Sequence, residues 1–279
     1  MKIDILSDLH LDQYFPHDNI VEDAISSIFT PIFTNNSTTK PNDILIIAGD
    51  IGHFNKQNIE VLKIFRKLYY KNIVCVLGNH DYYLLDNKIK NQYKNNSFSR
   101  VKQMRELINN EDGLYCLDGD VVEIDGVKFG GCDGWYSNAY MKEYFPNKSD
   151  KFVLSVWKHT INDYYNTSKI EDFMEMYKIE ERKIEKVYQK CDVMITHINP
   201  SYKHEHINKA YYNDEVNTFF TFYGHKYLKN GTMKYWVFGH THDAIEYEIE
   251  DVQFLCNPLG YPNESEYRDK INMKSFEII

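Results

Sequence analysis

Short apolar runs recur along the chain and predict strands that are buried on both faces. They cover residues 3–6, 44–48, 73–77, 193–196 and 236–238, and polar residues do not alternate within them. A strand with one face in water shows such alternation, whereas a strand covered on both faces reads as a continuous apolar run. These runs therefore predict the central strands of an α/β protein.

Helical periodicity fills the two intervals between the first three runs. Residues 18–33 place Ile20, Ala24, Ile28 and Ile32 four positions apart, and residues 57–70 repeat this spacing with their own apolar side chains. Such a stripe is typical of a helix that packs one face on a sheet. The alternation of strand, helix and strand predicts parallel strands joined by right-handed crossovers.

Two hairpins are expected in addition to the parallel strands. The first spans residues 121–129, with Asp-Gly at its turn, and the second spans residues 245–256, with Glu-Asp at its turn. Asp-Gly is a strong signal for the type I′ turn that joins antiparallel strands. Antiparallel and parallel pairs together predict mixed sheets.

Charge and composition narrow the classes of ligand and location. The 279-residue chain has a net charge of −9 and a pI near 5.7, which argues against a long nucleic acid as the main ligand. Small phosphorylated molecules fit better, since bound metal cations can supply local positive charge. The five cysteines form no CxxC pair, so we expect buried free thiols. With no apolar leader and no 18-residue apolar run, we expect a cytoplasmic protein without a membrane span.

Five short polar clusters follow the apolar runs, at the points where strands are expected to end. The clusters are Asp8-Leu9-His10, Gly49-Asp50, Gly78-Asn79-His80-Asp81, His197 and Gly239-His240-Thr241-His242. Each alone is a weak signal, because it also reads as a turn or a capped loop. Five in this order predict one site that binds two metals and a phosphate ester.

The clusters carry the donor atoms that divalent transition metals prefer. In an extended segment, residues i and i+2 point the same way, so Asp8 and His10 can bind one cation together. Asp50 has two carboxylate oxygens and can bridge two cations. The remaining donors are one amide oxygen and three imidazole nitrogens, from Asn79, His197, His240 and His242. This mixture suits Mn²⁺, Fe, Zn²⁺, Co²⁺ or Ni²⁺ better than Ca²⁺.

The clusters resemble the calcineurin-like metallophosphoesterases, whose pattern is DxH, GD, GNHD or GNHE, H and GHxH. Every element is present in this order from residue 8 to residue 242. The resemblance implies an α/β fold, a four-layer α/β/β/α sandwich with two mixed sheets between helical layers. It also implies two divalent metal ions, for which Mn²⁺ is our leading candidate.

The same resemblance implies a role for each residue. One metal would be bound by Asp8, His10, Asp50 and His242, and the other by Asp50, Asn79, His197 and His240, with Asp50 as the bridge. His80 would contact the phosphate and protonate the leaving oxygen, while a metal-bridging hydroxide attacks the phosphorus. Asp81 would either orient His80 or anchor its loop, and both interpretations stay open.

One departure from the family pattern bears on the substrate. Protein phosphatases of the superfamily carry an arginine after the GD element, in a GDxxDRG context. Here Asp50 is followed by Ile51-Gly52-His53-Phe54, so the arginine that would bind a phosphomonoester is missing. This favours the phosphodiesterase-type members over a Ser/Thr phosphatase.

Four further residues are weaker candidates for substrate binding. His53 lies three residues after Asp50, and His204 and His206 follow a candidate ligand, although exposed loop histidines are the favoured interpretation of the latter two. Asn257, in the turn after the last strand-like run, either supports the metal-binding loops or only ends that strand.

Residues 82–105 carry six lysines and arginines, one acidic residue and interleaved tyrosines. This composition suits nucleic-acid binding by stacking and charge, but a solvated loop and helix face is the favoured interpretation.

Residues 135–190 are charged, mostly helical in pattern and poor in glycine. We interpret them as a helical insertion or cap within a single domain of residues 1–279. Four aromatic residues make this insertion the candidate cover of the site: Trp135, Tyr136, Tyr140 and Trp157. We expect its deletion to change substrate choice and to leave metal binding intact.

We therefore interpret the chain as a binuclear-metal-dependent hydrolase of phosphate esters, with phosphodiesters of small nucleotides or metabolites as the leading substrates. The alternatives are a phosphomonoesterase or a DNA nuclease of the same superfamily, and a non-catalytic metal-binding interaction module. The expected partner is a small phosphorylated substrate. The sequence does not indicate the oligomeric state.

Overall fold

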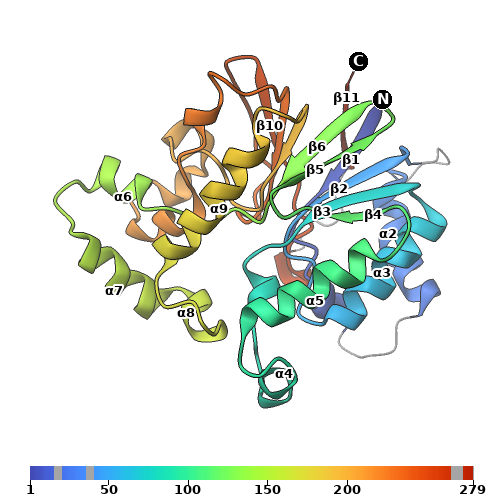
Figure 1. The fold of residues 1–279 in the computed structure, drawn as a ribbon, viewed down its shortest axis with the longest axis horizontal. Coiled ribbons are helices and arrows are strands. Elements are labelled where there is room, and N and C mark those ends of the chain that lie inside the picture. Colours follow the sequence, from blue (N-terminus) through green and yellow to red (C-terminus); the bar gives the residue numbers. More distant parts are fainter. Residues whose placement is uncertain (16–20, 36–40, 265–272, 279) are drawn as a thin grey trace.

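The computed structural model describes residues 1–15, 21–35, 41–264 and 273–278. Within these residues the strands form two sheets (Figure 1). The first has the order β11-β1-β2-β3-β4, with β1 Lys2–Leu6, β2 Ile44–Ala48, β3 Asn72–Val76, β4 Leu114–Cys116 and β11 Lys274–Glu277. The second has the order β5-β6-β7-β8-β10-β9, with β5 Asp120–Ile124, β6 Val127–Gly131, β7 Val193–Ile195, β8 Tyr235–Phe238, β9 Glu246–Ile249 and β10 Val252–Cys256.

Both sheets are mixed, as the sequence predicts. In the first sheet, β1 to β4 pair in parallel and β11 pairs antiparallel with β1. In the second sheet, β6, β7, β8 and β10 pair in parallel, and a hairpin closes each edge. Both hairpin turns have positive φ at their two central residues, which is the geometry of a type I′ turn.

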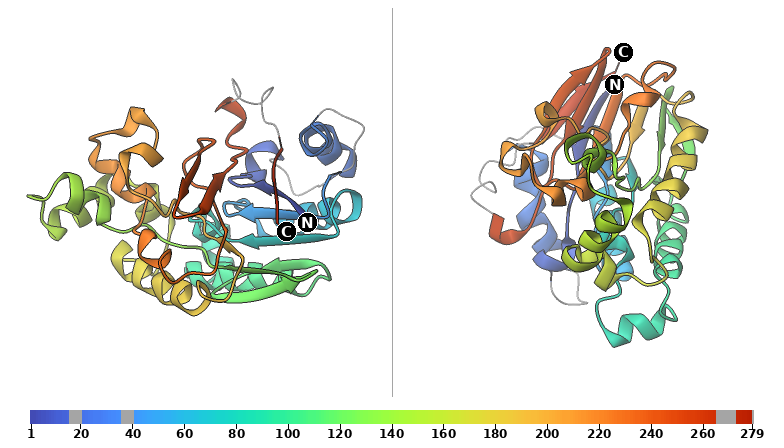
Figure 2. Two further views of the ribbon diagram at one scale, coloured as in Figure 1. Left: turned by 90° about the horizontal axis from the view of Figure 1, so that it is seen from above. Right: turned by 90° about the vertical axis from the view of Figure 1, so that its left-hand side faces the viewer.

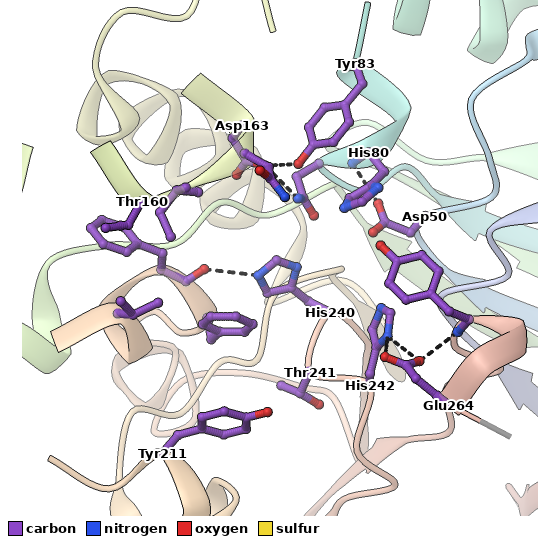
Figure 3. Close-up of a pocket in the computed structure, with 17 residues that line it drawn as sticks. Asp50, His80, Tyr83, Thr160, Asp163, Tyr211, His240, Thr241, His242 and Glu264 are labelled. Atoms are coloured by element: carbon purple, nitrogen blue, oxygen red, sulfur yellow. Dashed lines mark hydrogen bonds and ion pairs between the residues drawn. The ribbon is translucent and has the colours of Figure 1, made fainter. Parts of the chain in front are cut away.

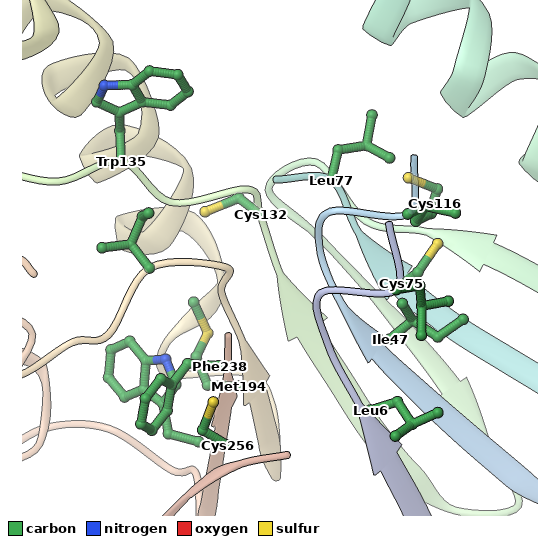
Figure 4. Packing of buried hydrophobic residues seen from close by; sticks show 14 of the residues in the cluster. Leu6, Ile47, Cys75, Leu77, Cys116, Cys132, Trp135, Met194, Phe238 and Cys256 are labelled. Carbon is green, nitrogen blue, oxygen red and sulfur yellow. The ribbon is translucent and has the colours of Figure 1, made fainter. Parts of the chain in front are cut away.

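The apolar runs are continuous because each inner strand is buried on both faces. On β2, Ile44 and Ile46 belong to the core between the sheets, whereas Leu45 and Ile47 belong to the core beneath the helices. The inter-sheet core also contains Phe129 of the second sheet, so the sheets pack face to face. The other core includes residues from the strand ends of both sheets (Figure 4).

Helices cover the outer face of each sheet and complete an α/β/β/α arrangement (Figures 1 and 2). Helices α3 and α5 pack on the first sheet and α9 packs on the second. The helices are α1 Leu11–Tyr14, α2 Glu22–Phe33, α3 Asn55–Leu68, α4 Asn87–Gln92, α5 Ser97–Asn109, α6 Ala139–Tyr144, α7 Asp150–Thr160, α8 Asn162–Asn166 and α9 Phe173–Val187. Short 3-10 turns are η1 His80–Tyr82, η2 His204–His206, η3 Lys209–Tyr211, η4 Glu215–Phe220, η5 His225–Tyr227 and η6 Pro262–Glu264. The expected helix at 18–33 is described from residue 22, and its first residues up to 20 lie outside the described ranges.

The segment 135–190 divides into two structural parts. Helix α9 belongs to the helical layer, because it packs on β5 and β6. Helices α6, α7 and α8 lie beside the sheets instead (Figure 1), and α6 and α7 contact η4. The part that can cover a site is therefore α6 to α8 together with η4.

The five cysteines are buried and free, as the sequence predicts. Among the helices described, none combines the length and the apolar character that a membrane crossing needs.

A buried carboxylate joins the two sheets near the ends of their strands. Asp133, just after β6, accepts hydrogen bonds from the Leu77 amide at 2.9 Å and the Tyr82 hydroxyl at 2.7 Å, and pairs with Arg105. Asp118 also pairs with Arg105, at 3.1 Å. Lys183 in turn pairs with Asp118 and Glu180, so three acids and two cations form one structural network of ion pairs.

We expect Asp133→Ala to lower the free energy of unfolding by about 3–5 kcal/mol, because it removes the buried partner of the Arg105 guanidinium and leaves it only the partly exposed Asp118 carboxylate. Asp118→Ala is the matched control. Its carboxylate is 38% exposed, so the expected loss is below about 1 kcal/mol. Urea unfolding of both variants measures the difference, and equal losses would contradict the assignment.

Candidate metal centre

The candidate ligands come from loops that follow the strands of both sheets and meet at one edge of the sandwich. Asp8 and His10 follow β1, Asp50 follows β2, Asn79 follows β3, His197 follows β7, and His240 and His242 follow β8. Because β1, β2 and β3 are parallel to one another, and β7 and β8 likewise, their ends gather the loops together. Ligand sites of α/β sheets lie at this carboxyl edge.

The backbone is left-handed at most of these positions. The φ angles are 52° at Asp8, 41° at His10, 53° at Asp50, 71° at His240 and 51° at His242. The expectation that Asp8 and His10 converge because they lie in an extended segment is therefore wrong. They converge through a turn, which costs a non-glycine residue of order 1–2 kcal/mol. Strain gathered on a few polar residues is typical of functional sites.

One group of donors surrounds a point between Asp8, His10, Asp50 and His242. The His10 and His242 Nε2 atoms lie 3.0 Å apart. The His10 Nε2 lies 3.8 Å from Asp50 Oδ2, and the His242 Nε2 lies 3.7 Å from Asp8 Oδ1. Lone pairs and carboxylate oxygens thus face one another, as they do around a cation.

A second group shares the same Asp50 oxygen. The His197 Nε2 lies 3.4 Å from Asp50 Oδ2 and 3.0 Å from Asn79 Oδ1. His240 joins this group, since its ring offers a nitrogen within 4.8 Å of donors on Asp50 and His197. Asp50 Oδ2 therefore stands between the two groups, where a bridging ligand must be.

Hydrogen bonds fix the outer nitrogens of three of these histidines. The His197 Nδ1 lies 2.8 Å from the Ala48 carbonyl, and the His240 Nε2 lies 3.0 Å from the Phe219 carbonyl. The His242 Nδ1 lies 2.9 Å from a Glu264 carboxylate oxygen. Such partners set the tautomer and the ring orientation of metal-binding histidines.

Burial and charge also suit divalent cations. The carboxylates of Asp8 and Asp50 are buried, and their ion pairs within the described ranges involve only histidines. Burial opposes the charged form of His197, but the Asp50 carboxylate outweighs it and raises the His197 pKa to about 10. A cation would replace this proton. Among the described residues, the buried His10 Nδ1 has no hydrogen-bond partner. The donor set therefore fits two divalent metal ions.

His80, the candidate acid, lies at the rim of this centre. Its amide donates to Asp50 Oδ1 at 2.9 Å, and its Nδ1 lies 3.3 Å from the His53 Nε2. The His53 Nδ1 lies 2.8 Å from Asp12 Oδ2. Burial lowers the His80 pKa, so its imidazole is neutral at neutral pH before any substrate binds. His53 therefore contacts His80 and links it to Asp12.

The structure distinguishes the two interpretations of Asp81. Its buried carboxylate accepts hydrogen bonds from the amides of Gly78 at 2.8 Å and of Ile51 and Gly52 at 3.3 Å. Within the described ranges it makes no hydrogen bond to the His80 ring. Asp81 therefore anchors the loops after β2 and β3, and its assignment as a catalytic residue is not supported by these contacts.

Three of the weaker candidates lie away from the cavity. His204 stacks between Tyr144 and Tyr212, with ring centroids 3.9 and 4.4 Å away, and His206 stacks on Tyr247. The Asn257 amide donates to the Ile5 carbonyl at 2.9 Å and so supports the end of β1.

Sequence reasoning missed Arg100, which it assigned to a basic surface. The guanidinium is fully buried and donates to the carbonyls of His80, Tyr83 and Gly52 at 2.9, 3.1 and 2.7 Å. It therefore ties the His80 loop to the Asp50 loop. Arg105 is also engaged internally, with Asp133, so the residues 82–105 present fewer free cations than their composition indicates.

A cavity of about 350 Å³ opens over the two donor groups (Figure 3). Its lining includes Asp50, Asn79, His80, His240 and His242. Another part of the wall is largely apolar and aromatic, and includes Ile161, Tyr211, Val216, Phe219 and Phe220. Tyr261 also lines the cavity, stacked on His10 with ring centroids 4.4 Å apart. In the described part of the chain, no lysine or arginine lines this cavity.

The comparison with protein families agrees with the site. The family model described as "Calcineurin-like phosphoesterase" matches residues 1–244, a range that contains all seven candidate ligands. The chain belongs to the calcineurin-like phosphoesterases. This family comprises divalent-metal-dependent hydrolases of phosphate esters, so the buried donor groups lie in a fold that holds metal for this chemistry.

Other proteins resemble the phosphoesterase over most of its length. A protein of Acanthamoeba polyphaga mimivirus is 25% identical over 280 residues, which cover 93% of this chain and 91% of that protein. Phosphopantetheinyl hydrolase from Mycobacterium tuberculosis has a similar fold, with a TM-score of 0.70 at 14% identity, covering 99% of this chain and 95% of that one. A dimetal phosphatase from Danio rerio matches with a TM-score of 0.42 at 13% identity, covering 94% and 87%.

We expect Gly78→Ala to weaken metal binding about tenfold or more, because a Cβ at this position would lie 2.1 Å from Asp50 Oδ1 and displace that carboxylate. The measurement is Mn²⁺ binding by equilibrium dialysis. Gly126→Asn serves as control, since no atom lies within 4 Å of its added Cβ and asparagine tolerates its positive φ. Unchanged affinity in Gly78→Ala would show that Asp50 does not depend on this close approach.

Proposed function

We propose that this chain hydrolyses phosphodiesters of small molecules, with two divalent cations held by Asp8, His10, Asp50, Asn79, His197, His240 and His242. The observation that carries the proposal is a cavity lined by His80 and four of these donors, Asp50, Asn79, His240 and His242, in which no described residue is a lysine or arginine. When bound, the cations would supply Lewis-acid chemistry, by lowering the pKa of coordinated water and neutralising charge on phosphate oxygens.

The charge of the cavity supports a diester over a monoester. At neutral pH a phosphomonoester carries close to two negative charges, whereas a diester carries one. Within the described ranges, the cavity offers no cationic side chain besides its histidines, and it contains the carboxylates of Asp50, Asp163 and Glu264. The missing arginine after Asp50 in the sequence has no spatial substitute in this lining.

The aromatic wall supports a substrate with an uncharged, flat or apolar group next to the phosphate. The Phe220 ring lies 4.9 Å from the His240 ring, and Tyr211 lies near-parallel to Phe220 with centroids 6.2 Å apart. A nucleobase or aryl group that contacted these rings would bring its phosphate toward the metal ligands. Aromatic stacking of this kind contributes about 1–3 kcal/mol per base.

The chain's own residues position the reaction. The hydrogen bond from the His80 backbone N–H to Asp50 holds His80 at the cavity rim. The His53 ring, which pairs with Asp12, contacts the Nδ1 of His80 and fixes the orientation of its ring. Once the negative charge of a bound phosphate favours its protonated form, a histidine placed in this way can protonate a leaving oxygen. Mn²⁺ is our leading candidate for both cations, and a cytoplasmic location remains part of the proposal.

A nuclease acting on long DNA receives less support. In the basic stretch of residues 82–105, Arg100 and Arg105 make contacts inside the protein, and its lysines are absent from the cavity lining. Such an enzyme needs a continuous cationic track for the backbone.

We expect the Mn²⁺-loaded protein to hydrolyse bis-p-nitrophenyl phosphate at a higher kcat/KM than p-nitrophenyl phosphate. His80→Ala should lower kcat for the diester by about 10²–10⁴-fold, since general acid catalysis contributes this much, while metal content stays at the wild-type level. Preference for the monoester would contradict the diester proposal, and turnover of neither ester but of single-stranded DNA would favour the nuclease.

We expect Phe220→Ala to raise KM for the bis-p-nitrophenyl ester about tenfold, because it removes the ring beside His240, with little change for the less bulky methyl p-nitrophenyl phosphate. Tyr165→Ala is a suitable control, since this exposed tyrosine is absent from the cavity lining. Steady-state kinetics with both esters make the comparison. An equal rise in KM for the two would show that Phe220 does not recognise the ester group.

A further inference from the structure

The insertion sends one buried carboxylate into the candidate metal centre. Asp163, on α8, is 1% exposed and lines the cavity. Its Oδ1 accepts hydrogen bonds from the Asn79 Nδ2 at 2.8 Å and from the Tyr83 hydroxyl at 2.6 Å. Its Oδ2 accepts from the Tyr136 hydroxyl at 2.5 Å. Figure 3 shows Asp163 and Tyr83 on the same side of the cavity as His80.

From these contacts we infer that Asp163 is a positioning residue for Asn79, and that the insertion thereby forms part of the metal site that Asn79 serves. A side-chain amide has one oxygen that can bind a cation and one NH₂ group that cannot. An ionised carboxylate only accepts hydrogen bonds. Asp163 therefore holds the Asn79 NH₂ and turns the Asn79 Oδ1 toward His197, 3.0 Å from its Nε2.

The environment of Asp163 keeps it in the accepting role. Its three side-chain donors are an amide and two phenols. Burial and the Asp163 charge raise the pKa values of Tyr83 and Tyr136 well above the usual range, so both hydroxyls keep their protons to donate. Tyr136 is itself held by the Trp157 indole N–H at 2.6 Å. The aromatic residues of the insertion thus fix Asp163 in place.

The charge of Asp163 points to the same conclusion. The Asp163 carboxylate is buried, yet it forms no salt bridge within the described ranges. An ionised carboxylate without a cation is costly in the interior. A divalent cation on the Asn79 oxygen would lie one amide group away from Asp163 and would supply the missing positive charge.

The insertion and η4 serve one of the two donor groups specifically. Asn79 is held by Asp163, and His240 is held by the Phe219 carbonyl of η4. By contrast, the other group is supported by neighbours outside the insertion: Ser7 donates to Asp8, and Glu264 contacts His242. The sequence predicts that metal binding survives deletion of the insertion. From these contacts we infer instead that deletion would weaken binding of the metal that Asn79 and His240 would hold.

The test is the metal content of Asp163→Asn and Asp163→Ala after loading with Mn²⁺. We expect wild-type protein to bind two Mn²⁺ per chain and the variants to bind one tightly, with affinity for the other lowered about 10–100-fold. Electron paramagnetic resonance should then show isolated Mn²⁺ in place of a spin-coupled pair. This readout needs no substrate, so it is independent of the diester proposal.

A charge-swapped variant separates positioning from a merely structural role. Asn79→Asp combined with Asp163→Asn places a donor at 163 and an acceptor at 79, keeps an oxygen at 79 for the cation, and should recover the second Mn²⁺ whose affinity Asp163→Asn lowers. Asp150→Ala is the matched control, because Asp150 accepts from Asn138 at 2.9 Å within the same insertion and is absent from the cavity lining. It should bind two Mn²⁺.

Two results would overturn the inference. One is retention of both Mn²⁺ with wild-type affinity in Asp163→Asn and Asp163→Ala. The other is an equal loss of both ions that the double variant does not reverse. If Asp163→Ala does not fold, as judged by circular dichroism, the near-isosteric Asp163→Asn and the double variant decide the question.

Discussion

Buried carboxylates without lysine or arginine partners are the constraint on which this site depends. Asp8 and Asp50 lie at the ends of adjacent parallel strands, and their ion pairs in the described chain are with histidines. Both side chains are buried, so neighbouring groups must compensate their negative charge. Without metal, a proton on His197, whose pKa the Asp50 carboxylate raises to about 10, neutralises part of this charge, and divalent cations would neutralise more of it. Metal bound at this point would therefore also stabilise the fold of these loops.

The backbone around these carboxylates is arranged for close approach. Gly78 brings the loop after β3 against Asp50, and left-handed turns at Asp8, His10 and Asp50 aim their side chains inward. Each such turn opposes folding by a small amount. Loop anchors offset it: Asp81 binds amides of both loops, and Arg100 binds carbonyls of both. Neither residue needs to touch substrate, yet the geometry of the ligands depends on both.

The sequence predicts those features that are local in the chain. Continuous apolar runs predict doubly buried strands, because the burial of a strand sets its pattern directly, and the ligand motifs follow those strands within a few residues. The family follows from the motifs. Arg100 shows the opposite case. The composition of residues 82–105 indicates a basic surface, and Arg100 becomes an internal anchor only because two loops approach each other in the folded chain.

Contacts between distant segments could not be predicted from the sequence, because they do not depend on local patterns. Asp163 lies in a charged helical stretch, Glu264 lies beyond the last motif, and neither sits at an informative spacing from a ligand. The turn at Asp8 and His10 was also misjudged, because nothing in the three letters of DxH distinguishes an extended segment from two left-handed residues. These features depend on the packing of the whole chain.

The position of α8 links substrate recognition to the metal centre. Residues of this segment line the cavity, and Asp163 in the same turn holds Asn79. Likewise η4 contributes Phe219 and Phe220 to the wall, and the Phe219 carbonyl holds His240. A change in these segments that reshapes the wall also shifts the support of a metal ligand. Cavity shape and the support of Asn79 and His240 therefore cannot vary independently in this chain, and Glu264, which contacts His242 in the other donor group, lines the same cavity.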